Sequence, residues 1–230
     1  MDKTYPVVVP AAGVGKRMQA DRPKQYLLLH GKTILEHTLA TLHAHPRIGQ
    51  IVVVLHPDDQ FFAHLPLAGA PWLTAVVGGQ ERADSVLAGL AAVQQQDWVL
   101  VHDAARPCIS HDDISRLLTL AEGEIGGLLA APVRDTMKRT DANGRVHATV
   151  ERQHLWHALT PQFFPFAQLH QALSQALSEQ VTITDEASAM EFAGHPVQLL
   201  QGDASNIKIT HPRDMLLAAV FLTHEYQDTL

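Results

Sequence analysis

Two kinds of segment alternate along the first half of the chain. Short, continuous apolar runs rich in Val and Leu are typical of strands that are covered on both faces. The longer stretches between them repeat apolar residues at helical spacing. Regular alternation of this kind predicts a mainly parallel sheet with helices on both faces. We expect strands at residues 7–9, 51–55, 75–77, 98–101 and 127–130, and helices at 33–43, 58–65, 82–95 and 110–121.

The pattern changes near residue 133. Two β-prone segments, 136–140 and 145–150, flank the sequence Asp-Ala-Asn-Gly at 141–144, and Asn-Gly in this position is a strong hairpin signal. Because an isolated two-stranded ribbon is only marginally stable in water, it needs a surface, either a domain of its own or another copy of the chain. We favour a dimerisation arm over residues 133–157. Farther along we expect helices at 165–178, from 184 and from 212, and a strand at 197–200.

Size and composition favour a single α/β domain. The chain has 230 residues, of which 46% are hydrophobic and 18% charged, an ordinary balance for a globular protein. One hydrophobic core can still serve a chain of this length. The sequence therefore predicts one Rossmann-like domain over residues 1–230, with the β-hairpin protruding from it.

Charge and cysteine content limit the partners and the compartment. The 17 Lys and Arg residues against 24 Asp and Glu residues give a formal net charge of -7, which argues against nucleic acid or an anionic membrane as a partner. The single cysteine, Cys108, cannot form an internal disulfide. The N-terminal residues lack the pattern of a signal peptide, and no apolar run approaches the ~18 residues that span a bilayer. We expect a cytoplasmic protein.

The loop after the first predicted strand has the composition of a phosphate-binding loop. Gly13 and Gly15, among other small residues, let the backbone approach a phosphate chain and direct N–H groups at it. Arg17 and Lys24 would neutralise a polyphosphate and its transition-state charge. The alternative is an ordinary turn with solvated basic residues. The segment is Pro10-Ala11-Ala12-Gly13-Val14-Gly15-Lys16-Arg17-Met18, followed later by Pro23-Lys24-Gln25-Tyr26.

Two better-known phosphate motifs do not fit this loop. A P-loop requires Ser or Thr after Gly-Lys, whereas Arg17 follows Lys16. A dinucleotide fingerprint requires a third glycine at the position that Met18 occupies. The loop therefore belongs to neither class.

A second group of polar residues follows the fourth predicted strand. Asp103 stands at its carboxyl end beside small residues, where a carboxylate can hold Mg²⁺ on a phosphate chain, and Arg106 could grip a second phosphate group. Asp103 could instead cap the following turn. The first and fourth strands are candidates for neighbours in the sheet, and ligands bind outside the carboxyl ends of such strands. Both loops would then meet at one site.

Histidine and cysteine patterns indicate no further chemistry. His154 and His157 are three residues apart and could share a helical face, but no HExxH motif or comparable ligand cluster accompanies them. We therefore expect no zinc or iron site. Cys108 has no evident activating base and is expected to be a small packed residue.

Several segments together resemble the 2-C-methyl-D-erythritol 4-phosphate cytidylyltransferase family. They match in order along nearly the whole chain, and although the first loop occurs in many nucleotidyltransferases, the set is specific. The length is too short for a fused second enzyme, so the resemblance implies a monofunctional form. The matching segments are 10–18 with 23–26, 78–86, 101–107, 131–138, 155–162, 184–186 and 206–210.

The resemblance implies a direct transfer reaction. The phosphate of methylerythritol 4-phosphate would attack the α-phosphorus of CTP, releasing pyrophosphate and giving 4-diphosphocytidyl-2-C-methyl-D-erythritol in the non-mevalonate isoprenoid pathway. The barrier is mainly the repulsion and misorientation of two polyanions, which cations, a metal and positioning can lower. Arg17 and Lys24 would be the catalytic residues, and Asp103 would help hold Mg²⁺.

The resemblance also implies how the two substrates are bound. Ala11, Gly79 and Ser85 would form a small pocket that admits cytosine and rejects a purine by size. Gln80 stands where we expect an acidic residue in some relatives. Arg152 would come from the arm of a second subunit, so that only a homodimer has a complete site. The CTP-binding residues would be Pro10, Ala11, Ala12, Gly13, Gly15, Gly79, Ser85, Asp103 and Ala104, and the acceptor-binding residues Arg106, Thr136, Arg152, Thr160 and Lys208.

Two other interpretations stay open. The nucleotide half of the pattern is shared more widely than the acceptor half, so the chain could be a cytidylyltransferase for another sugar or alditol phosphate. A non-catalytic nucleotide-binding regulator could lose the cations, whereas Arg17, Lys24 and Lys208 are all present. At the level of single residues, Thr136 and Arg152 could simply pair within the ribbon, and Lys208 could lie on a solvated edge.

Overall fold

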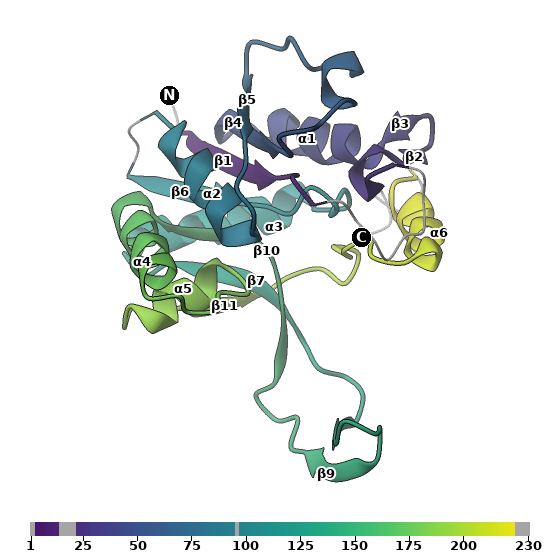
Figure 1. The fold of residues 1–230 in the computed structure, drawn as a ribbon, viewed down its shortest axis with the longest axis vertical. Coiled ribbons are helices and arrows are strands. Elements are labelled where there is room, and N and C mark those ends of the chain that lie inside the picture. Colours follow the sequence, from purple (N-terminus) through teal and green to yellow (C-terminus); the bar gives the residue numbers. More distant parts are fainter. Residues whose placement is uncertain (1–2, 14–21, 95–96, 224–230) are drawn as a thin grey trace.

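A seven-stranded sheet forms the centre of the computed structural model, which describes residues 3–13, 22–94 and 97–223 (Figure 1). The strand order is β11-β7-β10-β6-β1-β4-β5, and neighbouring strands are parallel except where β10 pairs. The predicted mainly parallel sheet is confirmed, and the first and fourth predicted strands, β1 and β6, are neighbours. The strands are β1 (Tyr5–Pro10), β4 (Ile48–Leu55), β5 (Leu73–Val77), β6 (Trp98–Val101), β7 (Gly127–Pro132), β10 (Trp156–Pro165) and β11 (Gln198–Gln201).

Helices lie on both faces of the sheet, and several of them begin at side-chain caps. Thr33 and Glu36 form a capping box at the start of the first helix, and Ser110 accepts a hydrogen bond from the backbone N–H of Asp113 at 3.1 Å, as its N-cap pattern predicts. No helix within the described ranges is long and apolar enough to cross a membrane. The helices are α1 (Ile34–Ala44), α2 (Arg82–Ala91), α3 (His111–Leu118), α4 (Phe166–Ser178), α5 (Glu186–Phe192) and α6 (Pro212–Phe221), with short 3-10 helices η2 (Lys24–Tyr26), η3 (Phe62–His64) and η4 (Thr119–Glu122).

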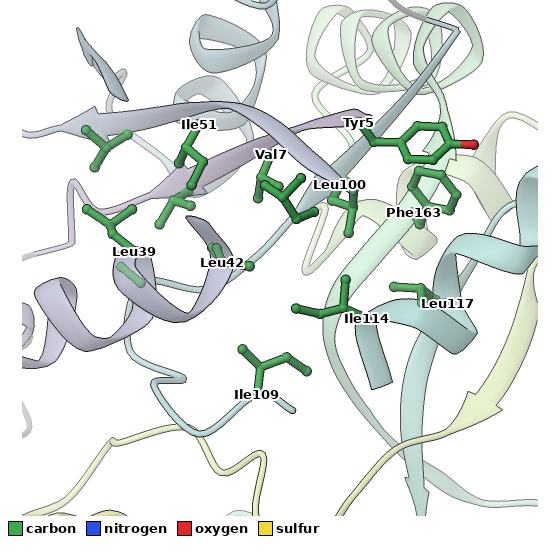
Figure 2. Close-up of a cluster of buried hydrophobic side chains, with 14 of the residues drawn as sticks. Tyr5, Val7, Leu39, Leu42, Ile51, Leu100, Ile109, Ile114, Leu117 and Phe163 are labelled. Carbon is green, nitrogen blue, oxygen red and sulfur yellow. The ribbon is translucent and has the colours of Figure 1, made fainter. Parts of the chain in front are cut away.

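The apolar run of β1 is buried on both faces. Val7 belongs to a cluster with side chains of α1 and α3, which Figure 2 shows, whereas Val8 packs into a second cluster with side chains of α2, α4 and α5. Phe163 of β10 joins the first cluster, and its ring meets that of Tyr5 at 5.1 Å in an edge-to-face arrangement. The core therefore continues through the sheet and fixes the carboxyl ends of β1 and β6 side by side.

The helix predicted over residues 58–65 is wrong. That segment contains only the short 3-10 helix η3. The carboxylate of Asp59 accepts hydrogen bonds from the backbone N–H groups of Phe61 and Phe62 at 3.0 and 2.8 Å, which favours a turn. Pro66 also disfavours the helical conformation at the residue before it.

His154 and His157 do not share a helical face, although their spacing would have allowed one. His154 lies in a turn with a φ of 70°, and His157 belongs to β10. No strand is among the sequence predictions for this segment, and Pro161, which has no N–H for a ladder, is unusual inside a strand that pairs on both sides. The structure accommodates it with a register shift between Ala158 and Gln162, while β10 pairs antiparallel with both β6 and β7.

The predicted hairpin is confirmed as a projection from the body of the molecule (Figure 1). β8 (Met137–Thr140) pairs with β9 (Val146–Val150), and the Asp141 carboxylate accepts hydrogen bonds from the backbone N–H groups of Asn143 and Arg145, both at 2.9 Å. Gly144 has a φ of +78°, which glycine adopts without the strain that a side chain adds. A second, two-residue hairpin joins β2 (Leu28–Leu29) and β3 (Lys32–Thr33).

Candidate active site

A cavity of about 650 Å³ opens at the carboxyl ends of β1 and β6. The loops after these two strands meet there, as the sequence predicts, and the segment at the start of α2 forms a further wall. The lining residues that the sequence singled out are Pro10, Ala11, Ala12, Gly13, Lys24, Gly79, Ser85, Asp103, Ala104 and Lys208. Two predicted residues of the first loop, Gly15 and Arg17, lie outside the described residues.

Close packing fixes the loops around this cavity. The side chain of Gln25 is buried and donates a hydrogen bond to the backbone carbonyl of Ala11 at 2.6 Å, so it ties η2 to the first loop. Gly78 has no room for a side chain, because a Cβ there would lie 2.6 Å from the Ser85 hydroxyl and 3.2 Å from the Ala12 Cβ. Gln25 and Gly78 both occur in the sequence motifs, but their positioning roles depend on contacts that only the fold reveals.

Asp103 is a buried carboxylate that faces three cations. Its Oδ2 lies 2.9 Å from Lys208 Nζ and 3.3 Å from Arg106 Nε, and its Oδ1 lies 3.3 Å from Arg82 Nη2. Burial alone would raise the pKa of the Asp103 carboxyl, but the charges of Lys208, Arg82 and Arg106 outweigh burial and hold this pKa well below its usual range. Asp103 is therefore ionised, and Lys208 lies at the cavity and not on a separate solvated edge.

Arg82 and Glu186 extend this cluster of charges, although neither was assigned a role from the sequence. Glu186 is fully buried at the first position of α5, and its carboxylate binds Arg82 at 2.5 and 3.2 Å. Burial raises the pKa of Glu186, and the Arg82 guanidinium opposes that rise. The two residues are 104 positions apart in the sequence, so no local pattern could have indicated the pair.

Two of the predicted acceptor-binding residues lie directly behind Asp103. The hydroxyl of Thr160 is buried and accepts a hydrogen bond from the backbone N–H of Asp103 at 3.0 Å. Arg106 is also buried and donates from Nη1 to the backbone carbonyl of Asn206 at 2.7 Å. The Asn206 side chain donates to the Thr160 carbonyl at 2.8 Å. These contacts make one connected wall that supports Asp103. Arg106 and Thr160 belong to this wall but do not themselves line the cavity.

Lys24 also lines the cavity. It belongs to η2, and its ammonium group donates to the backbone carbonyl of Ile209 at 2.7 Å, one residue beyond Lys208. The two lysines therefore approach the cavity from segments that are far apart in the sequence but joined by a hydrogen bond. A polyphosphate in the cavity would meet both charges.

Thr136 and Arg152 are exposed on the arm and do not line the cavity of the same chain. Arg152 donates to the backbone carbonyl of Arg134. Within a single chain, Arg152 thus makes a local contact near the ribbon, which is the alternative that the sequence left open.

The donor groups at the cavity suit a magnesium ion on a phosphate chain. Asp103 supplies one ionised carboxylate on the cavity wall, and Mg²⁺ is commonly bound through one or two carboxylates plus substrate phosphates and water. No group of three His, Cys, Asp or Glu side chains suited to a metal occurs among the described residues. Cys108 is buried, and burial raises the pKa of its thiol to about 12, which disfavours the nucleophilic thiolate.

Known proteins resemble this chain over nearly its full length. The profile of the family described as 2-C-methyl-D-erythritol 4-phosphate cytidylyltransferase matches residues 5–224. The protein of that name from Pseudoalteromonas atlantica is 58% identical over 222 residues, which cover 96% of each chain. The one from Escherichia fergusonii is 59% identical over 218 residues, which cover 94% of this chain and 92% of the relative.

Solved structures agree with the sequence comparison. The crystal structure of the Francisella tularensis protein of the same name superposes with a TM-score of 0.81 at 34% identity, covering 96% of this chain and 100% of that one. The Thermus thermophilus protein gives a TM-score of 0.80 at 31% identity, covering 94% of this chain and 98% of that one.

Proposed function

Because this chain belongs to the 2-C-methyl-D-erythritol 4-phosphate cytidylyltransferase family, we propose that the cavity between the β1 and β6 loops is its active site. The enzyme transfers a cytidylyl group from CTP to 2-C-methyl-D-erythritol 4-phosphate in isoprenoid biosynthesis. The observation that supports the location is the ionised Asp103 at the carboxyl end of β6, surrounded by cations and facing the small residues of the first loop.

On the nucleotide side, the first loop and the start of α2 hold CTP. Backbone N–H groups of the loop that follows Pro10 cradle the triphosphate. Ala11, Gly79 and Ser85, which all line the cavity, enclose the cytosine and exclude a purine by size. The full set assigned to CTP is Pro10, Ala11, Ala12, Gly13, Gly15, Gly79, Ser85, Asp103 and Ala104.

The chemical step needs charge neutralisation and positioning. The acceptor phosphate attacks the α-phosphorus, and pyrophosphate leaves. Arg17 and Lys24 stabilise the negative charge that builds on the transferring and leaving phosphates. Asp103 would hold Mg²⁺, which supplies further neutralisation of the triphosphate when it is bound. No covalent enzyme intermediate is required.

On the acceptor side, the phosphorylated alditol meets charges from two subunits. Lys208 reaches the cavity directly, with Arg106 and Thr160 in the wall behind it. Thr136 and Arg152 come from the arm, residues 133–157, of a second subunit. Two observations support this homodimeric arrangement: neither residue lines the cavity of its own chain, and the hairpin projects from the body of the molecule (Figure 1).

We also infer a cytoplasmic location without nucleic-acid or membrane partners. The single cysteine is buried and free, which suits a reducing compartment. The net charge of -7 gives no general attraction to polyanions.

A pyrophosphate-release assay tests the function. With CTP, Mg²⁺ and 2-C-methyl-D-erythritol 4-phosphate, we expect turnover that falls sharply when ATP, GTP or UTP replaces CTP. A panel of other sugar and alditol phosphates, with CTP held constant, checks the acceptor. Faster release with another acceptor would favour the related cytidylyltransferase, and CTP binding without release for any acceptor would favour the regulator.

A further inference from the structure

Arg82 and Glu186 form a charged link between two helices and the Asp103 loop. Arg82 is the first residue of α2, and Glu186 is the first residue of α5. The Arg82 guanidinium donates to both carboxylate oxygens of Glu186 at 2.5 and 3.2 Å, and its Nη2 also donates to Oδ1 of Asp103 at 3.3 Å. One arginine therefore joins a fully buried carboxylate to the carboxylate on the cavity wall.

The buried end of this link is firmly fixed. Gln162 of β10 accepts a hydrogen bond from the backbone N–H of Ala187 at 2.7 Å and donates to the Asp185 carboxylate at 2.9 Å. These contacts fasten the start of α5 to the central sheet. Glu186 has 0% exposure, so water cannot replace its contact with Arg82. Breaking the pair would leave an unpaired buried charge, which strongly lowers stability.

The contacts of Asp103 are divided between its two oxygens. Oδ2 is shared by Arg106 and Lys208, and the Lys208 side chain is 40% exposed on a flexible stem. Arg82 is the cation that contacts Oδ1 among the ion pairs of the described residues. Since the terminal torsion of an aspartate is broad, this contact limits rotation of the carboxylate.

We propose that Arg82 is a positioning residue for the reaction, anchored by Glu186, which holds the Asp103 carboxylate in the orientation that receives the divalent cation on the CTP triphosphate. The proposal rests on the metal role assigned to Asp103 under the proposed function. Arg82 acts through Asp103, in the way that residues behind metal ligands orient the ligands themselves.

Manganese binding to the full-length protein with CTP tests this role without relying on turnover. The test variants are Glu186→Gln, which removes the anchoring charge, and the double variant Arg82→Met with Glu186→Leu, which removes both charges and leaves no buried ion unpaired. By electron paramagnetic resonance titration, we expect Mn²⁺ affinity for the CTP complex to fall roughly 10-fold or more. The Mg²⁺ concentration for half-maximal turnover should rise by a similar factor.

Arg116→Met is the matched control. Arg116 pairs with Asp113, whose carboxylate is as deeply buried as that of Glu186, but neither residue lines the active-site cavity. If the Arg82–Glu186 pair were purely structural, its variants should behave like Arg116→Met. Both would then have a lower thermal midpoint and unchanged Mn²⁺ affinity. Arg82→Lys should recover only part of the affinity, because an ammonium group cannot span both carboxylates as the guanidinium fork does.

Asp103→Asn separates failure of this proposal from failure of the site assignment. If Asp103→Asn weakens Mn²⁺ binding but folded Glu186→Gln and the double variant bind it like the wild type, the positioning role is overturned and the metal role of Asp103 stands. If Asp103→Asn itself binds Mn²⁺ normally, both are overturned. Absence of wild-type turnover with CTP and the acceptor would contradict the function instead.

Discussion

Lys24 is the described residue whose chemical role is easiest to separate from stability. Its ammonium group lies at the cavity and contacts a backbone carbonyl, not the hydrophobic core. We expect Lys24→Ala to lower kcat by on the order of 10²- to 10³-fold, because the lost charge acts on the transition state. Pyrophosphate release measures this change, and circular dichroism checks the fold.

Lys32→Ala is the control for that substitution. Lys32 is exposed on β3, away from the cavity lining. Its removal should leave kcat unchanged. Near-normal turnover by a folded Lys24→Ala protein would contradict the catalytic role of Lys24.

His45 links the stability of the protein to pH. Its side chain is buried, with Nε2 3.0 Å from the Ser115 hydroxyl and Nδ1 accepting from the Arg47 N–H at 3.2 Å. Burial, with smaller contributions from His111 and Arg47, lowers the pKa of His45 from 6.5. The unfolded chain therefore takes up a proton that the folded protein resists, so stability is present above about pH 6.5 and is lost as the pH falls below it.

We expect His45→Gln to make the thermal midpoint less dependent on pH between about pH 7 and pH 5. Differential scanning calorimetry at several pH values measures the slope. His147→Gln, on the exposed surface of β9, is the control and should keep the wild-type slope. An unchanged slope in His45→Gln would show that His45 does not carry this linkage.

At the scale of single residues, local motifs predicted the groups that reach the cavity but not the groups that hold them. Asp103 follows a buried strand and Lys24 follows a glycine loop, so spacing alone suggested both. Arg82 and Glu186 meet across 104 residues, and Arg106 meets Asn206 across 100. Contacts of such separation depend on how the sheet is assembled, which a single sequence does not reveal.

Among the elements, β10 connects the core to the site. Phe163 is fully buried within it and contacts the rings of Tyr5 and Trp98. We expect Phe163→Ala to lower the free energy of unfolding by about 3–5 kcal/mol, through lost burial and a cavity that the rigid sheet cannot close. Urea denaturation measures the loss.

Leu216→Ala provides the comparison for that substitution. Leu216 lies on α6 and is 71% exposed, so its truncation should change stability by less than about 0.5 kcal/mol. A loss below about 1 kcal/mol in Phe163→Ala would mean that the core around β10 repacks.

Secondary structure was predictable where one physical signal dominated. Continuous apolar runs indicated β1, β4 and β6, and capping residues indicated α3. The β10 strand was missed because Pro161 opposes a ladder, and its neighbours on both sides supply the pairing that local propensity does not. The turn at Asp59 was missed because a side-chain hydrogen bond replaced the helical pattern.

For the whole molecule, net charge is a poor guide to the cavity. The chain carries a formal charge of -7, yet the described lining of the cavity contains Lys24, Arg82 and Lys208 against the carboxylates of Glu81 and Asp103. The global balance argues against a long polyanion as a partner. A local concentration of cations still suits a small triphosphate.

The structure of one chain does not explain what the residues of the arm contact. The hairpin was predictable from Asn-Gly between β-prone segments. The proposed place of Arg152 in the site of a second subunit came only from the family resemblance, because the packing of a single chain carries no information about contacts between subunits. The role of Arg152 therefore has to be tested between subunits.

Mixing Lys24→Ala with Arg152→Ala tests whether Arg152 serves the neighbouring site, at an acceptor concentration low enough that each variant alone has little activity. In a heterodimer of Lys24→Ala and Arg152→Ala subunits, a shared arrangement gives one site that has lost both residues and one that keeps both. Random exchange should therefore restore about a quarter of the wild-type activity, since half of the dimers are mixed and half of their sites are intact. If Arg152 instead acts in its own chain, every site lacks one residue and mixing restores nothing.

Sedimentation of the exchanged sample confirms that dimers have formed, and equal mixtures of each variant with itself set the background. A monomeric protein at micromolar concentration would contradict the shared site before any mixing is done.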